Sequence, residues 1–215
     1  MLIRSRISTY RLKKLFRCFC EDLTATQTAA VLNLNRNTVN RYYQYFRVRI
    51  VDYQESLAPD FSGEVELDES YFGPRRSRGR RGRGTAKIPV FGLKKRNGRV
   101  YTQIIKNASS REIRPIIKDL VTQGATLYTD SWRAYDGLVL NGYKHYRINH
   151  TDAVYSNGRG NHINGIENFW SYAKRRLLKF NGIRRQDFYC YLKETEFRYN
   201  EKDRMYQTML KFLSA

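Results

Sequence analysis

Acidic residues and cysteines are scarce in this sequence. It has 20 Asp and Glu against 40 Lys and Arg among 215 residues, so the formal net charge is +20. The three cysteines, Cys18, Cys20 and Cys190, are too few for a disulfide framework and favour a reducing compartment. The sequence contains no run of about 18 apolar residues, the length that a membrane-spanning helix needs. Its basic start also lacks the apolar core of a secretory signal. We therefore expect a cytoplasmic protein with no membrane partner.

The basic excess implies a polyanionic partner. A folded chain of this size repels itself at a charge of +20 unless a polyanion is close, and nucleic acid is the strongest candidate. An anionic membrane surface and a ribosomal location are the alternatives, but the charge here is spread over segments that also carry apolar pattern. A hydrophobic fraction of 41% and an aromatic fraction of 14% argue against a disordered chain. The composition thus predicts a folded nucleic-acid-binding protein.

The first 50 residues predict a small DNA-binding domain. They hold ten Lys and Arg against two acids, a net charge of +8. Residues 24–43 have the pattern of two short helices around a turn at 33–35, which is typical of a helix-turn-helix. The start of the second helix is where base edges are usually read. The residues there are Asn37, Thr38, Asn40 and Arg41. A plain helical hairpin is the alternative, and the flanking positive charge favours DNA binding.

From residue 63 the pattern changes to that of an α/β domain. Residues 51–62 read as a linker, in which Pro59 stops any helix. Asn97-Gly98 is a strong hairpin signal between two strands. We expect strands at 64–72, 88–95, 99–106, 125–130 and 143–149, and helices at 109–122, 131–140, 163–180, 186–200 and 204–213. Three strands followed by alternating helices and strands predict a ribonuclease H-like mixed sheet flanked by helices. The predicted domains are the helix-turn-helix domain 1–50, the linker 51–62, the catalytic domain 63–203 and a C-terminal helix 204–215.

Three acids stand at chemically informative places. Asp68 lies inside the first predicted strand, Asp130 ends the strand 125–130, and Glu167 opens the helix 163–180. A carboxylate within or at the end of a strand is costly to bury unless it is paired or metal-bound. Three converging carboxylates bind Mg²⁺, and two such ions activate an attacking hydroxyl and stabilise the leaving oxygen of a phosphodiester. For each acid alone, a surface or salt-bridged position is the alternative.

The helix that carries Glu167 has one apolar stripe, which covers about 100° of arc. It consists of Ile163, Ile166, Trp170, Ala173, Leu177 and Phe180. Glu167 and Lys174 lie at the edge of this stripe, about 20° apart in projection. A carboxylate at the margin of a buried face is well placed to lean over the edge of a sheet. We expect Trp170 to belong to the core.

Four blocks of sequence carry a family resemblance. They are E-L-D-E-S-Y-F-G, G-R-R-G-R-G-T-A-K-I-P-V-F-G-L, Y-T-D-S-W-R-A-Y and H-I-N-G-I-E-N-F-W-S-Y-A-K-R-R-L. Over about residues 60–200 they resemble DDE-type bacterial insertion-sequence transposases of the ribonuclease H-like integrase superfamily, in the compact group with the signature I-E-x-F-W-S-x-x-K-R. The resemblance implies that Asp68, Asp130 and Glu167 are catalytic and hold two Mg²⁺ (or Mn²⁺) ions per active site. It also implies that Lys174 contacts DNA phosphate beside them.

Longer members of that family carry a Cys-rich zinc ribbon. Cys18-x-Cys20 is too little for a zinc site, which leaves end recognition to the helix-turn-helix. The run 75–84 holds six arginines and three glycines; glycine lets the backbone approach DNA, and arginine neutralises phosphate. We expect DNA binding by Arg75, Arg76, Arg78, Arg80, Arg81 and Arg83. A solvated loop tip without DNA contact is the alternative.

Three further residues are candidates for a supporting role in the site. His162 and Asn164 come just before Glu167, and Glu66 shares a strand face with Asp68. Asp68 is preferred to Glu66 as the catalytic acid by the family resemblance, and geometry alone leaves Glu66 open. A histidine in a loop is more often incidental than functional.

These observations together predict a bacterial, nucleoid-associated transposase. It would bind double-stranded DNA at terminal inverted repeats, cut there, and join the 3′-hydroxyl ends to target DNA, as a homodimer or larger assembly. The alternatives are a metal-dependent nuclease of the same fold without strand transfer, and a DNA-binding regulator with a degenerate catalytic domain. A tyrosine recombinase is a further alternative, because the chain has 17 tyrosines. It would need an Arg/His/Tyr constellation and no metal.

Overall fold

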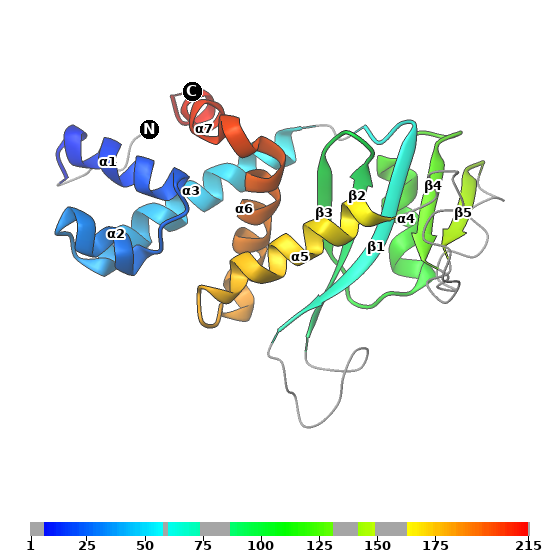
Figure 1. Ribbon diagram of the computed structural model, residues 1–215, viewed down its shortest axis with the longest axis horizontal. Helices are drawn as coiled ribbons and strands as arrows, with labels where there is room; N and C mark the ends of the chain where they lie inside the picture. The colour runs from blue at the N-terminus through cyan, green and yellow to red at the C-terminus, as the bar shows by residue number, and fades with distance from the viewer. Residues whose placement is uncertain (1–6, 58–59, 74–86, 131–141, 149–162, 215) are drawn as a thin grey trace. The chain divides into compact units, whose positions relative to one another are not determined.

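The computed structural model describes residues 7–57, 60–73, 87–130, 142–148 and 163–214 (Figure 1). By their contacts, the residues form two compact units, one of Met1–Leu57 with Leu177–Ala215 and the other of Ala58–Arg176. The predicted helix 131–140, the loop 150–162 and the arginine run 75–84 lie outside the described residues. None of the helices in the described ranges is both long enough and apolar enough to cross a membrane.

The second unit is built on a five-stranded mixed sheet. Its strands are β1 (Glu64–Phe72), β2 (Ile88–Lys95), β3 (Val100–Ile104), β4 (Thr126–Asp130) and β5 (Lys144–Ile148), in the order β3-β2-β1-β4-β5. β1, β2 and β3 are antiparallel, β4 is parallel to β1, and β5 is parallel to β4. Asn97 has φ +57° in the β2–β3 turn, as the Asn-Gly signal predicts. The predicted α/β ribonuclease H-like fold, with helices N-terminal to it, is confirmed.

One face of the sheet forms a hydrophobic core with α4 (Ser110–Leu120). Val65 and Leu67 of β1 are fully buried there, together with Ile113 and Ile117 of α4. Pro115 lies inside α4, as predicted, and the helix continues past it. Because side chains alternate along a strand, Glu66 and Asp68 point to the other face of the sheet, which is called the acid-bearing face below.

The helix α5 (Asn164–Leu178) crosses the acid-bearing face of the sheet (Figure 1). The predicted stripe is the buried one, with Ile166 and Ala173 at 0% exposure and Trp170 at 4%. Trp170 packs on the backbone of β2, where a Cβ on Gly92 would lie 2.5 Å from its ring. Glycine at position 92 therefore lets α5 approach the sheet closely beside Asp68, which pairs with Gly92 across the strands.

The first unit is all α. It contains α1 (Thr9–Cys20), α2 (Ala25–Leu32), α3 (Arg36–Ser56), α6 (Phe188–Glu201) and α7 (Met205–Ser214), with 3₁₀ turns at Arg185–Asp187 and Lys202–Arg204. Thr24 and Gln27 form a capping box at the start of α2, and Asn35 caps α3. Between them, Asn33 has φ +48°. These features produce the helix–turn–helix that the sequence predicts at residues 24–43.

The helix α3 extends further than expected. It ends at Ser56, so six residues of the predicted linker 51–62 are helical. The reason is a buried anchor: Gln54 is 9% exposed and donates to the carbonyl oxygen of Lys193 on α6.

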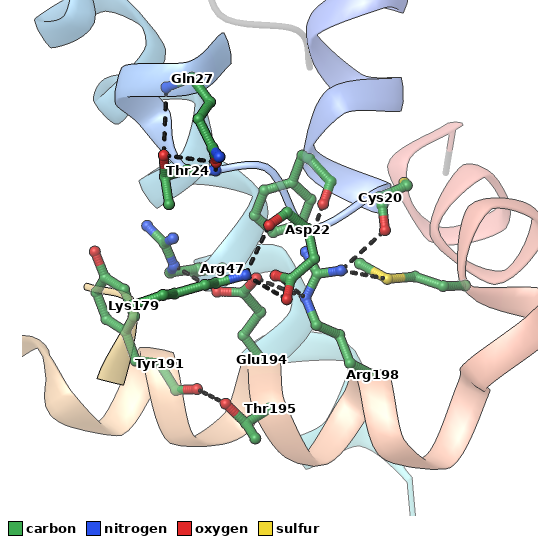
Figure 2. Close-up of polar contacts among 12 residues, drawn as sticks. Cys20, Asp22, Thr24, Gln27, Arg47, Lys179, Tyr191, Glu194, Thr195 and Arg198 are labelled. Carbon is green, nitrogen blue, oxygen red and sulfur yellow. Dashed lines mark hydrogen bonds and ion pairs between the residues drawn. The ribbon is translucent and has the colours of Figure 1, made fainter. Parts of the chain in front are cut away.

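Buried charges join α6 to the N-terminal helices (Figure 2). Glu194 accepts from Arg47 of α3 at 2.7 Å and from Arg198 at 2.8 Å. Arg198 also donates to the carbonyl oxygens of Phe19 and Cys20 at the end of α1. The contacts thus group α6 and α7 with residues 1–57. The predicted boundary at residue 203 instead assigns α6 to the catalytic domain and α7 to a separate C-terminal helix. As functional segments, the four predicted domains stay a prediction.

Candidate active site

The register of the sheet brings two of the predicted acids to one face. In the parallel pair of β1 and β4, Glu66 lies opposite Tyr128, and Leu67 lies opposite Thr129. Continuing that register places Asp68 beside Asp130. Both therefore project from the face that α5 covers.

Glu167 comes to the same face from the first turn of α5. Its neighbour Ile166 is buried at 0% exposure, whereas Glu167 itself is exposed. This is the margin position that the apolar stripe predicts. Glu167 therefore lies on the solvent-exposed edge of α5, on the same side of the sheet as Asp68 and Asp130.

The three carboxylates act on one another electrostatically. Burial raises the pKa of Asp68 from 3.8 to about 7, and repulsion from Asp130 and Glu167 adds to the rise. The backbone N–H of Glu69 and the indole of Trp170 partly offset it. Within the described ranges, no three His, Cys, Asp or Glu side chains stand close enough to hold one metal ion. Asp68 thus lies within electrostatic range of both other acids.

Two residues on elements that carry or cover the acids have contacts that the sequence did not suggest. Trp170, expected only as core, packs at Gly92 of β2, the residue that pairs with Asp68 across the strands. The signal was its position three residues after Glu167, one helical turn further on. His145 of β5 makes a 2.8 Å hydrogen bond with the hydroxyl of Thr129, which precedes Asp130 and points to the opposite face of the sheet. No sequence motif marks that histidine.

Glu66, the rival of Asp68, has a different environment. It is 2% exposed, and its Oε2 accepts the backbone N–H of Ile166 at 2.8 Å. Its carboxylate is thus engaged with the start of α5. Asp68, on the same strand face, is half-buried beside Asp130.

The other predicted site residues are distributed over both units. Lys174 and Asn164 are exposed on α5. On the first turns of α3, Asn37, Asn40 and Arg41 are exposed and Thr38 is half-buried. His162 lies outside the described residues, and so do Arg75, Arg76, Arg78, Arg80, Arg81 and Arg83.

The raised pKa of Asp68 predicts how stability depends on pH without metal. Because the folded protein holds this proton more tightly than the unfolded chain, stability falls as pH rises from about 4 through about 7. In EDTA, Asp68→Asn should therefore raise the melting temperature more at pH 8 than at pH 5. We expect a difference of at least about 3 °C, which corresponds to about 1 kcal/mol in a protein of this size. Melting curves at the two pH values measure it, and an equal effect at both would contradict the electrostatic account.

Comparisons with known proteins give the family. Residues 60–200 match the ISXO2-like transposase domain. A transposase-like protein of Haemophilus influenzae is 45% identical over 105 residues, which are 49% of this chain and 84% of that protein. A protein in the transposable element ISH50 of Halobacterium salinarum is 33% identical over 189 residues, 80% of this chain and 63% of that protein. The chain thus spans less than two thirds of the length of the second relative.

Solved structures of the Mos1 transposase are more distant. The paired-end complex with the left transposon end is 12% identical at a TM-score of 0.32 and covers 97% of this chain and 80% of that one. The Mos1 Strand Transfer Complex is 13% identical at the same TM-score and covers 100% and 80%. The family follows from the domain match over 60–200 and from the sequence relatives. On these grounds the chain belongs to the ISXO2-like family of DDE transposase domains.

Proposed function

We propose that this protein is a transposase that binds the terminal inverted repeats of its element, cleaves phosphodiester bonds there and joins the 3′-hydroxyl ends to target DNA. One observation supports the proposal: in a chain of this family, the strand register places Asp68 beside Asp130, and both Asp130 and Glu167 act electrostatically on Asp68. A divalent cation would offset both the burial and the repulsion that raise the pKa of Asp68.

The donor chemistry fits Mg²⁺ or Mn²⁺. These ions take oxygen ligands, usually a few carboxylates together with water and phosphate oxygens, so a set of three carboxylates matches that preference. Asp68, Asp130 and Glu167 would hold them, and two ions would supply activation of the attacking hydroxyl and stabilisation of the leaving oxygen. Asp68 and Asp130 project from adjacent strands and so give the site two ligands on a rigid support.

DNA recognition divides between two surfaces. The exposed side chains at the start of α3, Asn37, Asn40 and Arg41 with Thr38, would read base edges of the terminal repeats. Lys174 on α5 and the arginines of 75–83 would contact phosphates, which give affinity without sequence preference. Two transposon ends need two active sites, so the protein would act as a dimer or a larger assembly on DNA.

A joining assay tests the proposed function. The substrate is a duplex that carries the inverted repeat flanking the gene and ends in a free 3′-hydroxyl, mixed with a supercoiled target plasmid and Mg²⁺. The 3′ oxygen attacks a target phosphorus, and the displaced target 3′ oxygen leaves and takes up a proton. We expect duplex covalently joined to plasmid, and a control duplex with a 3′-deoxy end should give none. Cleavage of repeat DNA without any joined product would favour the nuclease, and binding without cleavage the regulator.

A further inference from the structure

A second glutamate on β1 contacts the start of the helix that carries Glu167. Glu66 is 2% exposed, and its Oε2 accepts the N–H of Ile166 at 2.8 Å. Ile166 is the third residue of α5, where backbone N–H groups have no partner within the helix. The bond is charge-assisted and lies at the positive end of the helix dipole, which makes it stronger than an ordinary hydrogen bond.

The carboxylate of Glu66 is held from the side of the sheet as well. Nε of Arg96 lies 3.4 Å from its Oε1, and the guanidinium of Arg96 stacks 3.8 Å from the ring centroid of Tyr128. Arg96 also pairs with Glu64, which accepts from the hydroxyl of Tyr128. Glu66 is thus fixed by the sheet on one side and receives the helix on the other.

The fit against the helix is close. A Cβ on Gly165 would lie 2.7 Å from Oε2 of Glu66 and 3.3 Å from its carboxyl carbon. A side chain at position 165 would therefore push the carboxylate and the helix apart. The absence of a side chain at this position allows the helix start to lie directly on the carboxylate.

We propose that Glu66 is a positioning residue: it sets the distance of the first turn of α5 from the sheet and the rotation of that turn about the helix axis. It thereby sets the position of Glu167 relative to Asp68 and Asp130. Glu167 follows Ile166 directly, so a shift of the anchored N–H moves the Glu167 side chain with it. This inference rests on the proposed function, because it assigns Glu66 a role in that same site. Glu66 acts through the backbone N–H of Ile166, and the metal ligands remain the other three acids.

The first experiment compares Glu66→Ala with Glu66→Gln in Mg²⁺-dependent end cleavage. Glutamine keeps the length and an acceptor oxygen, so it should retain most of the rate, whereas alanine should lose about 10- to 100-fold, the cost of a misplaced reacting group. The alanine variant should also need more Mg²⁺ for half-maximal rate, while its DNA affinity stays the same. A fold defect alone would lower the active fraction and leave that Mg²⁺ concentration unmoved. Loss in Glu66→Gln as deep as in Asp68→Asn would make Glu66 a ligand and overturn the proposal.

A second variant disturbs the same contact without altering the carboxylate. Gly165→Ala adds only a Cβ, and alanine favours a helix, so any loss must come from the close approach to Glu66. We expect about a 10-fold loss. The matched control is Asn168→Ala, at an exposed residue of the same helix, which should stay within about twofold of wild type. A wild-type rate in Gly165→Ala would contradict the proposal.

A third measurement separates this proposal from the proposed function. Amide hydrogen exchange at Ile166 in the metal-free full-length protein needs no activity. It should speed up at least about 10-fold in Glu66→Ala, because the amide loses its acceptor, and should remain slow in Glu66→Gln. Unchanged exchange in the alanine variant would overturn the positioning role whether or not the protein transposes DNA. Faster exchange in Glu66→Ala, in a protein that cleaves no DNA, would support the contact between Glu66 and Ile166 and contradict the proposed transposase function.

Discussion

Asp68→Asn, Asp130→Asn and Glu167→Gln should each lower the rate of end cleavage by at least about 1,000-fold, the loss expected when a group that stabilises the transition state is removed. Each change deletes one carboxylate charge from a site where the charges repel one another. DNA binding should stay intact or become slightly tighter, because each variant is one unit more positive beside phosphate. Cleavage of a repeat duplex and its binding by gel shift measure the two effects separately.

The matched control is Asp119→Asn. Asp119 is exposed on α4, and α4 packs on the opposite face of the sheet from the three acids. The variant removes the same charge from the same domain and should cleave at the wild-type rate. A wild-type rate in any one of the three site variants would remove that residue from the site. Loss of cleavage in Asp119→Asn as well would mean that charge, rather than position, controls the activity.

The sequence predicted those features that depend on local pattern. The apolar stripe of α5 has a period of 3.6 residues, and it placed Glu167 at the margin of the buried face, where the structure has it. Asn97-Gly98 located the β2–β3 turn, because Asn and Gly accept positive φ. The helix–turn–helix followed from Asn33 and Asn35, whose short polar side chains suit a left-handed turn and a helix cap.

The features that depend on packing between distant segments were not predictable. Glu66 and Asp68 are two residues apart on one strand face, so strand geometry alone does not separate them, and the contact of Glu66 with Ile166 appears only in the fold. Likewise the period of α6 shows that it is a helix, but not that Glu194 pairs with Arg47, 147 positions away. A periodic pattern fixes which side of an element is buried, whereas its partner depends on the whole fold.

Removing divalent metal should stop all chemistry, since the proposed role of the three carboxylates is to hold the ions that activate the attacking hydroxyl and stabilise the leaving oxygen. EDTA should abolish cleavage and joining, and Mg²⁺ or Mn²⁺ should restore both. Ca²⁺ should support DNA binding but little cleavage, because its larger and looser coordination shell positions oxygens poorly for in-line attack. The assay is cleavage of a labelled repeat duplex after dialysis against EDTA, with each ion added back alone.

The products of that reaction distinguish metal-assisted hydrolysis from a covalent mechanism. If water is the nucleophile in the first step, the cut ends carry free 3′-hydroxyls, which a DNA polymerase can extend. Denaturing gels should then show no protein attached to DNA at any time. The chain has 17 tyrosines, any of which in a recombinase-type site would form a phosphotyrosyl bond and need no metal. A protein–DNA adduct that survives SDS and forms in EDTA would therefore overturn the three-carboxylate mechanism, because no hydrolytic route through Asp68, Asp130 and Glu167 produces one.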